Sequence, residues 1–143
     1  MLNLIPGIQS TSSALNAERI RMDVVSQNIS NAQVTKGPDG KPYQRQQVVF
    51  QTVLDAQVQE AGGASGGSTV QVAKIVTDQR PPILAYRPGH PDADARGMVA
   101  MPNINVHEEM VDLIASSRSF EANLAVVKSA RSMAMQSLSI GKR

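Results

Sequence analysis

The residue types that could bind a metal ion lie together in one segment, PGHPDADARG (88–97). His90, Asp92 and Asp94 fall within it, and the spacing D-x-D-x-x-G is similar to that of a calcium loop. A calcium loop needs a further oxygen ligand and a bidentate glutamate, whereas Arg96 and Asn103 occupy those positions. The sequence therefore favours a tight turn whose aspartates accept hydrogen bonds from backbone amides. We predict no metal ligands, and the alternative is a metal-dependent enzyme built on His90, Asp92 and Asp94.

A second candidate for chemistry is the acidic group formed by Glu108, Glu109 and Asp112. Glu108 and Asp112 are four residues apart and would share one face of a helix. His107 is the one potential catalytic partner nearby. Because acids at a helix start complement the helix dipole, a structural role explains these residues without catalysis.

Composition argues against several other functions. The chain has 143 residues, no cysteine, 3% aromatic residues and a formal charge of +2. Disulfide and thiolate chemistry are therefore excluded, and the scattered basic residues do not form the clustered patch that nucleic-acid binding needs. No apolar run approaches the roughly 20 residues of a membrane span. We predict no enzymatic activity, no cofactor or small-molecule substrate, no nucleic-acid partner and no direct membrane insertion.

The last third of the chain is predicted to form one long helix. Asn105 with Glu108 three residues later is typical of an N-cap with a capping box, and neither Pro nor Gly interrupts residues 103–140. About 35 residues at 1.5 Å each give a rod of roughly 50 Å. A compact domain of this length would be about 37 Å across. This helix must therefore protrude, and its apolar stripe needs a partner.

A second helix is predicted from about residue 8 to residue 29, ending in the short polar residues Asn28, Ser30 and Asn31. Its apolar residues recur every seven positions, although Thr11 and Glu18 interrupt the stripe. This heptad spacing is typical of a coiled-coil seam. A chain that leaves and returns would place the two helices antiparallel.

The region between the helices is predicted to contain short strands. Segment 43–54 shows period-2 alternation, with Val48, Phe50 and Leu54 on one face. A second strand covers about 70–76, and further short strands cover 83–86 and 98–101. The turn GPDG (37–40) precedes them. The segment AGGASGGS (61–68) lacks the G-K-[S/T] ending of a phosphate-binding loop and is predicted to be a flexible loop.

The predicted fold class is therefore α+β, with long antiparallel, coiled-coil-like terminal helices flanking a small β-rich middle. Residues 1–32 and 103–143 would form a helical axial core, and residues 33–102 a small β region. The predicted assembly interface consists of the larger apolar residues of the two stripes: Ile8, Leu15, Met22, Val25, Ile29, Met110, Leu113, Ile114, Phe120, Leu124, Val127 and Leu138.

Three segments resemble the flagellar axial family, the bacterial flagellar rod and hook proteins. SALNAERIRMDVVSQNISNA (13–32) resembles the N-terminal signature, with its Ala-Leu start and Asn-Ile-x-Asn-Ala finish. NINVHEEMVDLIASSRSFEANL (103–124) resembles the C-terminal signature. PGHPDADARGMVAMPN (88–103) is similar to a segment of the proximal rod member, and the large inserts of the longer distal-rod and hook proteins are missing.

The resemblance implies a structural subunit of the proximal rod of the flagellar basal body. Such a subunit would assemble with copies of itself and with other rod proteins into the helical drive shaft that crosses the periplasm and transmits torque. It would be exported by the flagellar type III apparatus without a cleaved signal peptide. Composition alone, with no signal peptide in residues 1–8, would instead default to the cytoplasm. The alternatives are another axial rod subunit, or a cytoplasmic coiled-coil adaptor or secretion chaperone.

Overall fold

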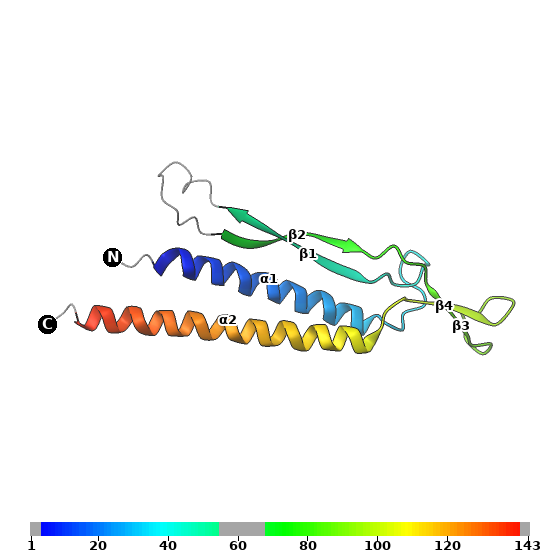
Figure 1. The fold of residues 1–143 in the computed structure, drawn as a ribbon. Coiled ribbons are helices and arrows are strands. Elements are labelled where there is room, and N and C mark those ends of the chain that lie inside the picture. Colours follow the sequence, from blue (N-terminus) through cyan, green and yellow to red (C-terminus); the bar gives the residue numbers. More distant parts are fainter. Residues whose placement is uncertain (1–3, 55–67, 141–143) are drawn as a thin grey trace.

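The computed structural model describes residues 4–54 and 68–140, which form two helices and four strands. The elements are α1 (Leu4–Ser30), β1 (Gln46–Leu54), β2 (Ser68–Thr77), β3 (Ile83–Tyr86), β4 (Met98–Met101) and α2 (Val106–Ile140). Figure 1 shows an elongated molecule in which α1 lies between α2 and the β1–β2 hairpin. The β3–β4 hairpin projects at the end where α2 begins, and the start of α1 and the end of α2 lie at the opposite end.

Helix α1 begins about one turn earlier than its predicted start near residue 8. Pro6 lies in the first turn of this helix, where a backbone N–H has no intrahelical acceptor and its absence costs nothing. The helix ends at Ser30, as the short polar residues predicted. The carbonyl oxygen of Gln27 accepts both the backbone N–H of Asn31 (3.0 Å) and its side-chain amide (2.8 Å), so Asn31 closes the last turn with two bonds to one carbonyl.

Strand β1 begins at Gln46, three residues later than the predicted start at Tyr43. The preceding turn is confirmed: Gly40 has φ +70° and donates its N–H to the carbonyl oxygen of Gly37 (3.0 Å). Tyr43 then donates its N–H to the carbonyl oxygen of Val34 (3.3 Å). The backbone N–H of Tyr43 therefore bonds to the α1–β1 connection and not to a strand.

The β1–β2 hairpin is antiparallel and pairs Gln46 with Thr77 and Leu54 with Ser68. Its register shifts between Val49 and Phe50, because β2 contains an extra residue there. The predicted clean division of β1 into a buried and an exposed face is not seen, since Val49 and Phe50 are 38% and 36% exposed. The predicted loop 61–68 lies outside the described residues except for Ser68, which begins β2.

The two short strands β3 and β4 have the predicted bounds and pair antiparallel, Ile83 with Met101 and Tyr86 with Met98. Gly97 adopts φ +74° at the end of their connecting loop. A side chain there would meet the ring of Tyr86 at about 3.0 Å, so only glycine fits this position without strain.

Helix α2 has 35 residues and begins as the capping signal predicted. The Asn105 Oδ1 accepts the N–H of His107 (3.1 Å), and the Asn105 amide donates to Glu108 Oε1 (3.0 Å). A usual capping box would return Glu108 to the backbone N–H of the cap residue. Here the reciprocal bond is made to the Asn105 side chain instead.

The architecture confirms an α+β fold with two long helices and a small antiparallel β middle made of two separate two-stranded sheets. The helices lie side by side and run in opposite directions (Figure 1). The buried hydrophobic side chains among the described residues are mostly small: Ala17, Val24, Val25, Ala32, Val99 and Ala130. Neither described helix is apolar enough over its length to cross a membrane.

Candidate assembly interface

The end of α1, the start of β1 and the start of α2 meet at one buried asparagine. Asn28, 1% exposed, accepts at Oδ1 from the N–H of Gln46 (2.9 Å) and from the hydroxyl of Tyr43 (3.1 Å). Its amide donates to the carbonyl oxygen of Gln46 (2.9 Å) and to Glu109 Oε2 (2.9 Å). Two donors and two acceptor lone pairs are all an asparagine side chain has. Every polar site of Asn28 is therefore satisfied.

Glu109 is the charged member of this group and is 1% exposed. Its Oε1 accepts from the Arg45 Nε at 2.5 Å, and its Oε2 accepts from Asn28. A buried carboxylate is tolerated only when it is paired and hydrogen-bonded, and both conditions hold here. We call Asn28, Tyr43, Arg45, Gln46 and Glu109 the polar clasp.

The charges continue outward from the polar clasp toward solvent. Arg45 also lies 3.9 Å from Asp112, and Asp112 lies 3.7 Å from Arg21. The Asp112 and Arg21 side chains are 41% and 35% exposed. Solvent screens such pairs, so they contribute at most about 1 kcal/mol each. The buried Arg45–Glu109 contact is the one that fixes geometry.

The pKa of Tyr43 is affected both by burial and by the charge of the polar clasp. Burial of the phenol raises the pKa of Tyr43 above its ordinary value of 10.0, and the negative charge of Glu109 raises it further. Both causes disfavour the phenolate. The neutral hydroxyl is also the form that donates to Asn28.

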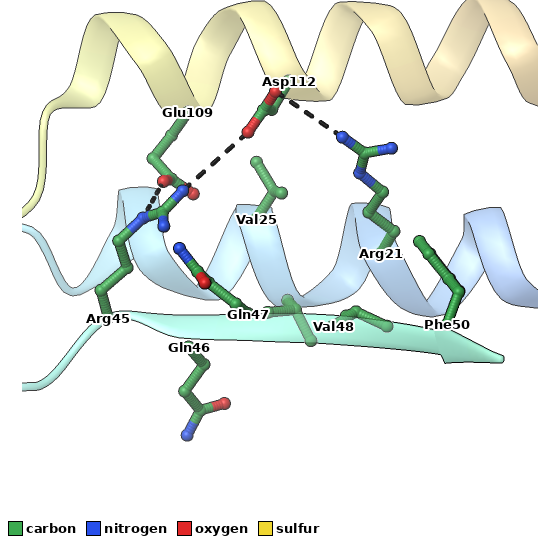
Figure 2. A pocket seen from close by; sticks show the side chains of 10 residues that line it. Arg21, Val25, Arg45, Gln46, Gln47, Val48, Phe50, Glu109 and Asp112 are labelled. Atoms are coloured by element: carbon green, nitrogen blue, oxygen red, sulfur yellow. Dashed lines mark hydrogen bonds and ion pairs between the residues drawn. The ribbon is translucent and has the colours of Figure 1, made fainter. Parts of the chain in front are cut away.

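An open groove of about 320 Å³ lies beside the polar clasp (Figure 2). Its walls come from three elements: Arg21, Val24 and Val25 of α1, Gln46, Gln47, Val48 and Phe50 of β1, and Glu109 and Asp112 of α2, with Arg45 next to β1. The two carboxylates in it face arginines, as the dashed lines in Figure 2 show. These charged groups therefore hold three elements together.

The structure places the twelve residues of the predicted interface in three ways. Five are more than a third exposed: Ile8 37%, Met110 49%, Ile114 55%, Leu124 37% and Leu138 68%. Leu15, Met22, Ile29, Leu113, Phe120 and Val127 are half-buried. Val25 is 6% exposed and lines the groove inside the molecule.

Helix α2 thus carries two stripes where the sequence suggested one. Apart from Asp112 and Ser117, its buried or half-buried side chains alternate at steps of three and four: Val106, Glu109, Leu113, Ser116, Phe120, Asn123, Val127, Ala130 and Ala134. Among the described elements α2 contacts α1 alone, so this inner stripe faces α1. The outward stripe, defined by Met110, Ile114, Leu124, Met135 and Leu138, lies beside it and is exposed.

Sequence reasoning missed the small and polar members of the inner stripe. Glu109, Ser116 and Ala130 are the buried residues of α2, and none was a candidate for the interface because large apolar residues were sought. Glu109 had been explained by the helix dipole and Asn28 by helix termination. The missed signal is the seven-residue spacing of Glu109, Ser116, Asn123 and Ala130.

The segment considered for a metal site forms the favoured tight turn. Asp94 Oδ1 accepts the N–H groups of Arg96 (2.8 Å) and Met98 (2.9 Å). Asp92 accepts from the hydroxyl of Thr35 (2.8 Å), and His90 Nδ1 accepts the N–H of Asp92 (3.2 Å). Within residues 4–54 and 68–140, no three His, Asp or Glu side chains gather as a metal site would require.

Comparison with known proteins gives matches to both ends of the chain. Residues 8–38 match the family "Flagella basal body rod protein", and residues 95–140 match "Flagellar basal body rod FlgEFG protein C-terminal". These ranges contain α1 from residue 8 onward and the whole of α2, and therefore both Asn28 and Glu109 of the polar clasp.

Similar proteins also span nearly the whole chain. Flagellar basal-body rod protein FlgC of Salmonella typhimurium (strain LT2) is 45% identical over 130 residues, 91% of this chain and 92% of the relative. The FlgC proteins of Yersinia enterocolitica and Bacillus subtilis (strain 168) are each 40% identical, covering 99% and 92% of this chain and 100% and 94% of theirs. The chain therefore belongs to the FlgC family of structural flagellar basal-body rod proteins.

Proposed function

We propose that this chain is a torque-bearing subunit of the proximal rod, in which the outward stripe of α2 packs against neighbouring subunits. The observation that carries the proposal is the exposure of Met110, Ile114, Leu124, Met135 and Leu138 along a helix whose described neighbour is α1 alone. Apolar area left exposed in one molecule is stabilising when a neighbour covers it, by about 1.5–3 kcal/mol for a large side chain.

The inner stripe supports a coiled-coil-like pairing of α1 and α2 as the axial core, residues 1–32 and 103–143. Its steps of four and three residues are those of a heptad seam. Small residues in that seam, such as Ser116 and Ala130, permit close approach of the two helices. Residues 33–102 then form a separate β region attached through the polar clasp.

Head-to-tail packing of such subunits builds a polymer and does not close on itself. The partners are copies of this chain and other rod proteins. The role is structural and not enzymatic. We further propose export through the flagellar type III apparatus without a cleaved signal peptide, as the resemblance to the flagellar axial family implies.

The test is Leu124→Asp with Ala125→Asp as the matched control. Leu124 lies on the outward stripe, where burying an unpaired carboxylate costs several kcal/mol. Ala125 is exposed one residue further along the helix and off both stripes. Cells producing the Leu124→Asp chain are expected to be non-motile, with the protein absent from purified basal bodies, while Ala125→Asp cells swim. Normal motility with Leu124→Asp would refute the role of the outward stripe.

The same fractionation separates the two rival functions. An adaptor or secretion chaperone remains in the cytoplasmic fraction, whereas a rod subunit co-purifies with detergent-extracted basal bodies. Another axial subunit would co-purify as well, and labelling the chain for electron microscopy of those particles distinguishes a proximal from a distal position.

A further inference from the structure

The outer edge of β1, the one that faces away from β2, is hydrogen-bonded at its first residue, Gln46. Both the N–H and the carbonyl oxygen of Gln46 bond to the side-chain amide of Asn28. On the opposite edge of the hairpin, Ser13 and Ser10 of α1 bond the N–H of Val70 and the carbonyl oxygen of Ser68 (3.3 and 2.9 Å). Helix α1 thus satisfies one end of each hairpin edge.

Beyond Gln46 the edge of β1 is open. Strand residues point their N–H and C=O groups alternately toward the paired strand and away from it. The carbonyl oxygen of Arg45 accepts the N–H of Asp78, which directly follows β2, so the backbone groups of Arg45 face the β2 side. The N–H and C=O groups of Gln46, Val48, Phe50 and Thr52 therefore point away from β2. Among the hydrogen bonds between described residues, none reaches the backbone of these last three.

The two edges of the hairpin differ in how they are protected. Proteins guard an open strand edge with lysine, proline, charge or a bulge. Strand β2 carries Lys74 and the bulge opposite Val49/Phe50. Strand β1, QQVVFQTVL, has no charged residue and no proline over nine residues, and it is rich in β-branched side chains. The edge of β1 therefore has none of these protective features, as expected of an edge that another strand covers in the assembled state.

The groove beside the polar clasp runs along this edge. Gln46, Gln47, Val48 and Phe50 form its β1 wall, and Val24 and Val25 line its α1 side (Figure 2). An extended segment lying along the edge would direct alternate side chains into this groove. Because Arg21, Arg45, Glu109 and Asp112 already pair with one another, the groove favours an uncharged side chain.

We propose that the edge of β1 from Val48 to Thr52 is a docking site for an extended, uncharged segment of another rod protein, which adds to the hairpin as a third strand. This inference rests on the proposed rod function. Pairing between the β1 edges of two copies is not expected. Such pairing would be two-fold symmetric and closed, whereas a rod grows in one direction.

The experiment compares three proline variants in cells where the variant is the sole copy. Val48→Pro and Thr52→Pro each remove an outward N–H of β1 and keep the ladder bonds with β2. Ile75→Pro is the matched control, because Ile75 is the cross-strand partner of Val48 and its N–H lies on the guarded outer edge of β2. Amide exchange of Gln47 and Val49 in the purified chains checks that the hairpin remains folded.

The amount of each chain in purified basal bodies is the readout. We expect the incorporated amount of Val48→Pro and of Thr52→Pro to fall by about fivefold, the effect of one lost hydrogen bond, while Ile75→Pro matches the unmodified chain. Three variants that all incorporate normally, or all fail equally, overturn the proposal. If the unmodified chain itself is absent from basal bodies, the rod function fails instead.

A photoreactive amino acid at Thr52 identifies the occupant. An adduct with another rod protein supports the proposal. An adduct that joins the β1 strands of two copies overturns it. So does the absence of any adduct at Thr52 when the same amino acid at Leu124 gives one.

Discussion

At the scale of single residues, two buried polar side chains determine how the terminal halves of the chain meet. Asn28 and Glu109 are 81 positions apart in sequence, yet their side chains bond at 2.9 Å and each is 1% exposed. A hydrophobic contact tolerates sliding by one turn, whereas this contact is satisfied in one alignment of the helices. The polar clasp therefore fixes the alignment of α1, α2 and β1 more strictly than apolar packing could.

Removing Glu109 is expected to destabilise the isolated chain strongly. Glu109→Ala leaves Arg45 and the Asn28 amide buried without their partner, and such a loss costs about 3–5 kcal/mol. Glu109→Gln keeps an acceptor and should cost about 1–3 kcal/mol. Asp112→Asn touches the same arginine from a 41% exposed position and should cost less than about 1 kcal/mol. Urea unfolding gives the three free energies; equal losses for Glu109→Ala and Asp112→Asn would contradict this account.

Tyr43 gives the polar clasp a predictable dependence on alkaline pH. The pKa of Tyr43 is raised in the folded chain, so the folded state holds the phenolic proton more tightly than the unfolded state, whose pKa is about 10. Its contribution to stability is complete below that pH and is lost as pH rises through the folded pKa. Tyr43→Phe removes this titration and the bond to Asn28, costing about 0.5–1.5 kcal/mol at neutral pH.

Urea unfolding of both chains between pH 8 and pH 11 measures this effect. The stability difference between the unmodified chain and Tyr43→Phe should shrink above pH 10. A difference that stays constant over that range would show that Tyr43 does not titrate with folding.

At the scale of elements, the two adjacent stripes of α2 differ in what they contact. The inner stripe contacts α1 and includes the buried Ser116, whose hydroxyl has no hydrogen-bond partner among the described residues. A small side chain at this position permits the close approach of the two helices. The outward stripe consists of Met, Ile and Leu side chains, and these are exposed.

Two substitutions at Ser116 separate size from polarity. Ser116→Ala removes an unpaired buried hydroxyl and keeps the close approach of the helices, so stability should stay within about 0.5 kcal/mol or rise. Ser116→Leu overfills the seam and should cost about 1–3 kcal/mol. Thermal unfolding followed by circular dichroism measures both. A stable Ser116→Leu chain would show that the two helices do not pack closely there.

How far the sequence predicts this fold depends on the distance over which each signal acts. Local signals succeeded: the cap at Asn105, the turn at Gly40 and the bounds of β3 and β4 all follow from neighbouring residues. The polar clasp could not be predicted in the same way. Its bonds join residues up to 81 positions apart, and polarity alone gives no sign that a side chain will be buried.

The division of α2 into two stripes could not be predicted from the sequence for a related reason. Leu113 and Ile114 are adjacent and equally apolar, yet the first is half-buried against α1 and the second is 55% exposed. Which of them faces inward depends on the rotation of the whole helix. Glu109 and Ser116 set that rotation, and both are unremarkable in a hydrophobicity pattern.

At the scale of the whole molecule, α2 extends past the start of α1. Because Asn28 meets Glu109, antiparallel helices with the same rise place Leu4 opposite approximately residue 133. The last turns of α2 therefore have no described part of α1 beside them, and Figure 1 shows this end of α2 projecting beyond α1. Met133, Met135, Leu138 and Ile140 are 54–76% exposed there.

We predict that this overhang serves assembly and contributes little to the stability of one molecule. Deleting residues 134–143 should change the free energy of unfolding of the purified chain by less than about 0.5 kcal/mol, since few contacts are lost. The same deletion should abolish incorporation into basal bodies, because the exposed apolar side chains lose their place in a neighbour. Replacing Met135, Leu138 and Ile140 by serine keeps the length and should have the same two effects.

Limited proteolysis of the isolated chain should cut within 134–140 before it cuts near Glu109, since lone helical turns are marginally stable. A truncated chain that still assembles would show that the overhang is not required for assembly.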